Sequence, residues 1–299
     1  MYALFCILFS LFSGPLNAQS CDKNTEESVI LRAMRVAAVA DAPLEIPRED
    51  SFLLAADSYN TEREKLKKEA DIYEMKDPQE NVSGALFVTF EDDPKVVYLS
   101  FPGVRGISAE QGFGLSHDIK YVLSASSTSV DGNRNHRVQQ GVDKWFDRLQ
   151  KTLGEKILEK RNAGQRIVFS GHCLGAARAE RALYTLGQEG NALLTFAPVI
   201  KPFDEKTQQD FTEQNPNVAM YNFTLEDDFW FGQPFKTLVK PLSYSMALGI
   251  PITLPAPSND WWWNTHRAKR YISVVGQWLK TPEGQRFSQE LKQHLTVSH

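Results

Sequence analysis

The sequence is poor in cysteine, with three in 299 residues, and on inspection it has no basic stripe, repeat or low-complexity tract. So few cysteines exclude a scaffold held together by several disulfides. The formal net charge of -4 and the pI near 5.9 lack the electrostatic signature of a nucleic-acid-binding protein. The lack of repeats excludes a solenoid. We therefore expect a globular chain without a nucleic-acid partner.

Two kinds of binding motif are also missing from the sequence. No cluster of His, Cys, Asp and Glu has the spacing of metal ligands, and no glycine-rich loop has the pattern of a phosphate-binding turn. We therefore predict no cofactor and no metal ion.

The N-terminus holds the one long apolar run, residues 2–12, followed by Gly14-Pro15 and Leu16-Asn17-Ala18. The run is too short to span a bilayer comfortably, and small residues follow it, so we predict a signal peptide over residues 1–18. It lacks the usual Lys or Arg at its start, which leaves a buried N-terminal helix or strand as the alternative. The prediction implies an exported protein, secreted or periplasmic. Cys21 matches a lipoprotein anchor poorly, because Ala18 and Gln19 do not fit that motif.

The remaining chain is long enough for one large α/β domain. Spaced apolar residues predict amphipathic helices over 26–40 and 47–75, so we interpret residues 19–80 as an N-terminal helical cover segment. Residues 81–299 then form the main domain.

Alternating strand and helix patterns define that domain. We predict a hairpin of strands at 85–90 and 96–101, a helix over 142–160, a strand at 167–169 and a helix that ends near Leu186. Further buried strands are expected at 192–198 and 218–224, an irregular segment at 236–257 and a helix from about residue 267. This order predicts an α/β fold, with a central, mostly parallel sheet and helices on both faces.

A reactive side chain is expected where the strand at 167–169 meets its helix. Gly171-His172-Cys173-Leu174-Gly175 has the spacing of a nucleophile elbow, a sharp turn that lifts one side chain out of the sheet. Position 173 also lies where helix N-terminal amides favour an anion. Two alternatives stay open: Cys173 is an inert buried thiol, or it forms a disulfide with Cys21.

An elbow nucleophile needs an acid and a histidine, which follow it in the chain. Asp227 and Asp228 come just after a strand, and we prefer Asp228 while keeping Asp227 as a rival. His266, between an aromatic cluster and a helix, is the predicted base. His294 and His299 lie in a charged tail that we expect to be frayed.

At these residues the chain resembles the class 3 (fungal-type) lipases of the α/β-hydrolase fold, over roughly residues 82–275. The elbow is similar to the family's GHSLG motif, with Cys173 in place of serine. Weaker similarities follow the family's order: Phe101-Pro102-Gly103-Val104 to F-R-G-[ST], Asp118 to W-x-x-D, residues 136–142 to H-x-G-F, residues 228–234 to D-I-V-P-x-L-P, and His266 with Tyr271 to the terminal histidine and its helix.

The resemblance implies a lipase- or esterase-like acyl hydrolase that acts on lipid esters and contacts a lipid surface. Cys173, Asp228 and His266 would form the triad, and the backbone N–H groups of Val104 and Leu174 the oxyanion hole. Residues 105–135 occupy the lid position. Because a thioester forms on cysteine, acyl transfer and thioester hydrolysis are alternatives, and so is an inactive lipid-binding or interaction protein.

Overall fold

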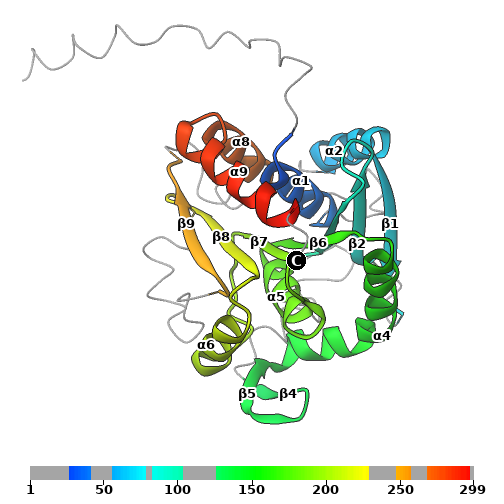
Figure 1. The fold of residues 1–299 in the computed structure, drawn as a ribbon, viewed down its shortest axis with the longest axis vertical. Helices are drawn as coiled ribbons and strands as arrows, with labels where there is room; N and C mark the ends of the chain where they lie inside the picture. Colours follow the sequence, from blue (N-terminus) through cyan, green and yellow to red (C-terminus); the bar gives the residue numbers. More distant parts are fainter. Residues whose placement is uncertain are drawn as a thin grey trace, which may run out of the picture.

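The computed structural model describes residues 27–41, 56–78, 83–103, 126–228, 247–256 and 268–296. Its centre is a seven-stranded sheet (Figure 1) in the order β1-β2-β3-β6-β7-β8-β9. The strands are β1 (Ala70–Lys76), β2 (Ser83–Phe90), β3 (Val96–Phe101), β6 (Arg166–His172), β7 (Ala192–Phe196), β8 (Ala219–Leu225) and β9 (Ile250–Leu254). The β1–β2 and β2–β3 pairs are antiparallel, and the four pairs that follow are parallel. This confirms the predicted fold class.

Helices cover both faces of the sheet (Figure 1). One face carries α1 (Val29–Asp41), α2 (Ala56–Glu69), α8 (Ala268–Trp278) and α9 (Pro282–Thr296). The other face carries α4 (Gln140–Asn162), α5 (Leu174–Leu186) and α6 (Glu205–Gln214). A short hairpin of β4 (Ser127–Val130) and β5 (Asn133–Gln139) stands apart from the sheet.

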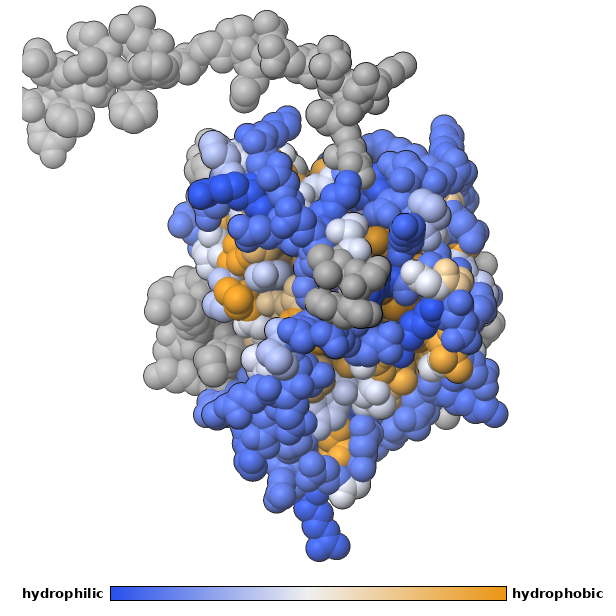
Figure 2. All heavy atoms as spheres, viewed as in Figure 1, coloured by the Kyte–Doolittle hydropathy of each residue, from blue (hydrophilic) through white to orange (hydrophobic). Residues whose placement is uncertain are grey.

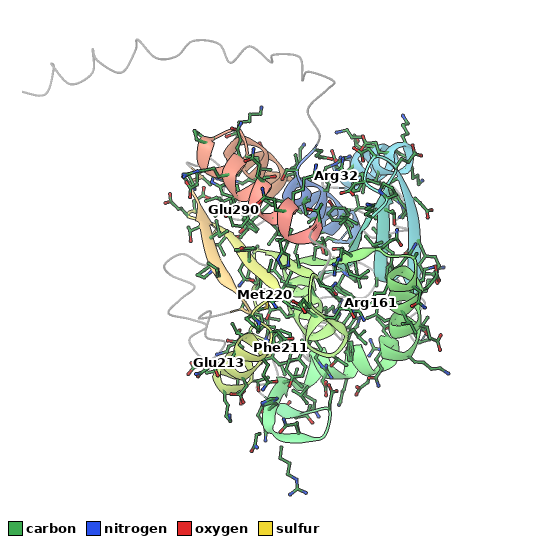
Figure 3. All side chains as sticks on the ribbon, viewed as in Figure 1. Arg32, Arg161, Phe211, Glu213, Met220 and Glu290 are labelled. Carbon is green, nitrogen blue, oxygen red and sulfur yellow. The ribbon has the colours of Figure 1, made fainter. Side chains whose placement is uncertain are left out.

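The alternation of strand side chains explains why two hydrophobic cores form. In β6, Val168 faces the α1 core, whereas its neighbour Phe169 faces the α5 core, and both are fully buried. Parallel strands with helices on both faces need apolar residues on both faces, which is why β6 and β7 appear in the sequence as continuous apolar runs. In Figure 3, Met220 of β8 and Phe211 of α6 lie on the opposite side of the sheet from Arg32 of α1.

The predicted hairpin at 85–90 and 96–101, the helix before the elbow and the helix ending at Leu186 are all confirmed. Three local predictions are wrong. The helix predicted over 47–75 ends at Glu69, and β1 follows it because it pairs along its length with β2. The irregular segment 236–257 contains β9, which pairs with β8. The tail expected to be frayed is helix α9, held to the core by its buried leucines.

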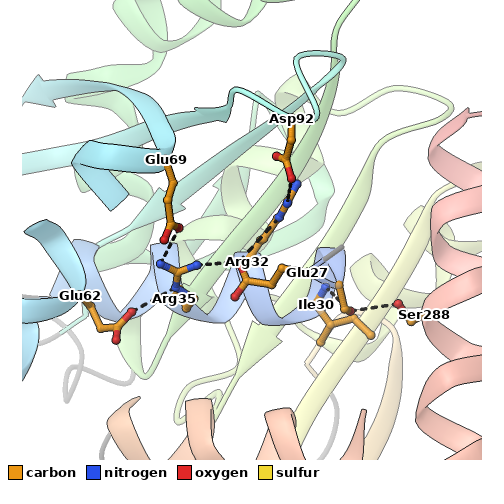
Figure 4. Close-up of polar contacts among 9 residues, drawn as sticks. Glu27, Ile30, Arg32, Arg35, Glu62, Glu69, Asp92 and Ser288 are labelled. Carbon is orange, nitrogen blue, oxygen red and sulfur yellow. Dashed lines mark hydrogen bonds and ion pairs between the residues drawn. The ribbon is translucent and has the colours of Figure 1, made fainter. Parts of the chain in front are cut away.

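The N-terminal helix α1 lies in the core. Eleven of its residues are buried, among them Arg32 and Arg35. Arg35 pairs with Glu27, Glu62 and Glu69 at 2.6, 3.1 and 2.9 Å, as Figure 4 shows. Buried charges are tolerated only when they are paired in this way, so the ion pairs fix where α1 sits.

Residues before position 81 therefore supply a core helix and a strand of the sheet. The division at residue 81 between cover segment and main domain stays a prediction. The predicted signal peptide and Cys21 lie outside the described residues, so export, and a disulfide between Cys21 and Cys173, also stay predictions.

The outer surface is largely hydrophilic on the face that Figure 2 shows, with apolar atoms only in small groups. Among the described helices, none combines the length and the apolar character needed to cross a membrane.

Candidate functional site

Cys173 lies on a sharp turn between β6 and α5. Its backbone has φ 56° and ψ -124°, a conformation that side-chain-bearing residues rarely adopt. Its N–H donates to the carbonyl of Phe196 on β7 at 3.0 Å, which ties the turn to the sheet. The side chain is partly exposed at the first turn of α5, where the helix dipole favours negative charge. Local strain of this kind is characteristic of functional sites.

The two glycines of the motif are required by the closeness of the neighbouring backbone. A Cβ on Gly171 would lie 2.2 Å from the carbonyl carbon and oxygen of Gly175. A Cβ on Gly175 would lie 2.2 Å from the carbonyl oxygen of Phe101 on β3. Both distances are far inside van der Waals contact, so the turn accepts only glycine at these positions. The sequence pattern Gly-x-Cys-x-Gly therefore reports a real elbow geometry.

The carboxyl end of β8 places its two aspartates in different surroundings. Asp227 forms a short ion pair with Arg270 and is partly exposed. Asp228 is fully buried and accepts a hydrogen bond from the hydroxyl of Tyr271 at 2.7 Å. Burial and the neighbouring Asp228 raise the pKa of Tyr271 well above its usual value, so that hydroxyl remains a donor.

Tyr271 also connects Asp228 to the elbow. Its ring packs edge-on against the ring of His172, with centroids 5.6 Å apart and an interplanar angle of 67°. Its hydroxyl accepts a hydrogen bond from the N–H of Leu225 at 3.2 Å, which fixes it at the end of β8. The elbow of β6 and the buried carboxylate of β8 are thus held by one aromatic side chain from α8.

The end of β3 reaches the same place. Gly175 packs against the carbonyl of Phe101, and the guanidinium of Arg178 donates to the carbonyl of Pro102 at 2.9 Å. Arg178 is buried and lies over the ring of Trp145, 5.0 Å from its centroid. These contacts fix the backbone immediately before Val104.

Solved structures with this arrangement are lipases. One is a triacylglycerol lipase whose catalytic centre is a serine protease triad (TM-score 0.51, 14% identity, 77% of this chain and 80% of that chain). Another is the mono- and diacylglycerol lipase from Aspergillus oryzae (TM-score 0.51, 19% identity, the same coverage). A third is a Rhizomucor miehei lipase propeptide complex (TM-score 0.52, 15% identity, 81% and 77%).

The chain has the fold of the fungal lipases. No family model matches the sequence. No curated protein matches it either. The sequence has thus diverged far from these lipases, whereas the path of the chain has not.

Within the lipase fold, several predicted site residues are described. Cys173 and its flanking residues Gly171, His172 and Gly175 form the elbow, Asp228 lies at the end of β8, and Leu174 is the buried first residue of α5. Others lie outside the described residues: Val104, Asp118, Trp261, Trp262, Trp263 and His266. Of the region 105–135, only residues from 126 onward are described, and they contribute to the β4–β5 hairpin.

The three histidines that the structure describes have other contacts. His136 lies 2.9 Å from the carboxylate of Asp210 and 2.5 Å from the hydroxyl of Tyr184. His294 lies 3.2 Å from the carbonyl of Asn191. His172 contacts Asp41 at the end of α1. Over the same residues, no group of three or more His, Cys, Asp or Glu side chains could hold a metal ion.

Sequence reasoning missed Asp41, Arg178 and the hydroxyl of Tyr271. Asp41 is 131 residues from His172 in the chain, and it sits in a segment whose apolar spacing indicates only a helix. Arg178 has the appearance of a surface residue on an amphipathic helix. Their roles depend on contacts between distant segments, for which the sequence has no local signal.

One buried carboxyl on α5 leads to a pH-dependent prediction. Glu180 is fully buried, and its Oε2 accepts from the N–H of Leu248 at 3.1 Å. Across the described part of the chain, its Oε1 has no hydrogen-bond partner. Burial raises the pKa of Glu180 from 4.5 to about 8. The folded state therefore keeps a proton between these pH values that the unfolded chain releases.

The free energy of unfolding should consequently fall as pH rises from about 4.5 to 8, by up to about 1.4 kcal/mol for each pH unit. Glu180→Gln, which stays neutral, should flatten this dependence. Urea denaturation at pH 5, 6.5 and 8 measures the slope, with the exposed Glu155→Gln as control. An unchanged slope in Glu180→Gln would contradict the prediction.

Proposed function

We propose that the protein is a lipase-like acyl hydrolase that cleaves carboxylic esters with Cys173 as nucleophile. The observation that carries the proposal is the strained turn that presents a partly exposed thiol at the N-terminus of α5, in a chain with the lipase fold. A strained elbow with a cysteine at its apex has no structural role that a glycine would not perform with less strain.

The proposed triad pairs Cys173 with His266 and Asp228. Asp228 is preferred over Asp227 because the latter is neutralised by Arg270, whereas the former is buried beside the elbow through Tyr271 and His172. A buried carboxylate can orient a histidine and stabilise its protonated form, which is the task of a triad acid.

The reaction follows from these assignments. His266 takes the thiol proton, and the Cys173 sulfur attacks the ester carbonyl to form a tetrahedral intermediate. The N–H groups of Val104 and Leu174 would stabilise its oxyanion. The C–O bond then breaks, the leaving alcohol takes the proton from His266, and a thioester remains on Cys173. Water, deprotonated by His266, hydrolyses the thioester, releases the acid and restores the thiol.

The proposal is tested by hydrolysis of p-nitrophenyl esters of graded acyl length, before and after alkylation with iodoacetamide. We expect turnover to fall in proportion to the alkylated fraction of Cys173, and the preferred acyl length to indicate the size of the acyl pocket. Full activity after complete alkylation would refute a cysteine nucleophile.

Two results without turnover point elsewhere. A thiol that becomes alkylated only after reduction would indicate a disulfide with Cys21. A readily alkylated thiol without ester turnover would favour another acyl acceptor, a thioester substrate or a lipid-binding role.

A further inference from the structure

The last residue of α1 contacts two parts of the candidate site at once. Oδ2 of Asp41 lies 2.6 Å from Nδ1 of His172 in the elbow, and Oδ1 accepts the N–H of Gly103 at 2.5 Å. Because a carboxylate can only accept, His172 carries a proton on Nδ1. The side chains of Asp41 and His172 are 11% and 5% exposed, so water competes little for these bonds.

The fit around Asp41 is tight. A Cβ on Gly103 would lie 2.7 Å from Oδ1 of Asp41 and 3.0 Å from the carbonyl oxygen of His172. Only a glycine leaves room for the carboxylate between β3 and the elbow. The site is therefore shaped for Asp41, which argues against an incidental surface contact.

Both contacts lie one residue from atoms that the proposed reaction uses. Gly103 precedes Val104, whose N–H is a proposed oxyanion donor, and His172 precedes Cys173. The ring of His172 also packs on Tyr271, which donates to Asp228. Asp41 thus bears on the oxyanion side, the nucleophile and the acid through a single carboxylate.

From this geometry, and resting on the proposed function, we infer that Asp41 is a positioning residue for the acyl-transfer site. It fixes the spacing between the oxyanion strand end and the elbow without touching the substrate. Charge-assisted hydrogen bonds are short and directional, so one carboxylate shared by two segments makes them move together. Because catalysis depends on placement to within about 0.5 Å, loosening this spacing should slow the chemical step while binding stays intact.

The test compares Asp41→Asn and Asp41→Ala with Glu69→Gln in ester hydrolysis. The control weakens the contact of Arg35 with Glu69, which also holds α1 but lies away from the site. Asparagine keeps the shape and can accept only one of the two bonds, whereas alanine keeps neither. We expect kcat to fall about ten-fold in Asp41→Asn and about a hundred-fold in Asp41→Ala, with KM within about two-fold of wild type.

The control should keep the wild-type kcat, even if its melting temperature falls as much as that of Asp41→Asn. A wild-type kcat in both Asp41 variants, or a rise in KM alone, would overturn the inference while leaving the proposed function intact. If Asp41→Ala fails to fold, the kcat of Asp41→Asn decides. Absence of ester turnover in the wild-type protein would overturn the proposed function, and this inference with it.

Discussion

Cys173→Ala should lower the kcat for ester hydrolysis by about 10⁴-fold or more. Loss of the nucleophile in an enzyme with a covalent acyl intermediate removes both half-reactions, and only the contribution of the oxyanion hole and substrate binding remains. Alanine has the same backbone strain at φ 56° as cysteine, so the elbow itself should survive the substitution. The measurement is kcat with a p-nitrophenyl ester of the preferred acyl length.

Cys173→Ser is the matched variant. Serine differs from cysteine by one atom and keeps a nucleophilic group, so any turnover that it retains should be insensitive to iodoacetamide. Melting temperatures of both variants should stay close to that of the wild-type protein, which separates lost chemistry from lost structure. Activity within ten-fold of wild type in Cys173→Ala would remove this residue from the mechanism.

Gly175→Ala should cause the largest loss of stability among single methyl additions at the elbow. The new Cβ would lie 2.2 Å from the carbonyl oxygen of Phe101 and 3.1 Å from the carbonyl carbon of Pro102. These are backbone atoms of β3 and its end, which cannot change rotamer, so the helix or the strand must move. We expect a loss of about 3–5 kcal/mol in the free energy of unfolding, measured by urea denaturation.

Gly154→Ala provides the control of opposite sign. Gly154 lies inside α4, and its added Cβ would meet only the Cδ2 of Leu186 at an ordinary 3.7 Å. Alanine in a helix interior should stabilise the protein by about 0.5–1 kcal/mol relative to glycine. Equal effects at the two positions would show that the elbow is not as tightly packed as described.

Local patterns explain what the sequence could predict. The apolar run at 167–169, the glycines at 171 and 175 and the helix after them form one continuous stretch, so the elbow follows from neighbouring residues alone. Asp228 was found because residues just after a parallel strand reach the functional edge of the sheet. The seven-stranded, mostly parallel sheet follows from the same alternation of strand and helix.

Non-local pairing explains what the sequence could not predict. β1 has charged residues that suit a helix, and it becomes a strand because β2 offers it a partner along its length. β9 contains Pro251, which an edge strand tolerates and a central strand does not. Asp41 stands at the end of an ordinary helix, and its importance depends on where β3 and β6 bring Gly103 and His172.

The contacts of α1 also determine when the protein can fold. Ser28 at its start bonds to Ser288, 260 residues later, at 3.0 Å, and Asp41 at its end waits for His172. A helix of 13 residues is marginal in water by itself. At a synthesis rate of about 5–20 residues per second, α1 leaves the ribosome on the order of ten seconds or more before α9. During that interval its apolar faces and its arginines have no complete binding surface. The site therefore assembles last, in a slow step with a high loop-closure cost.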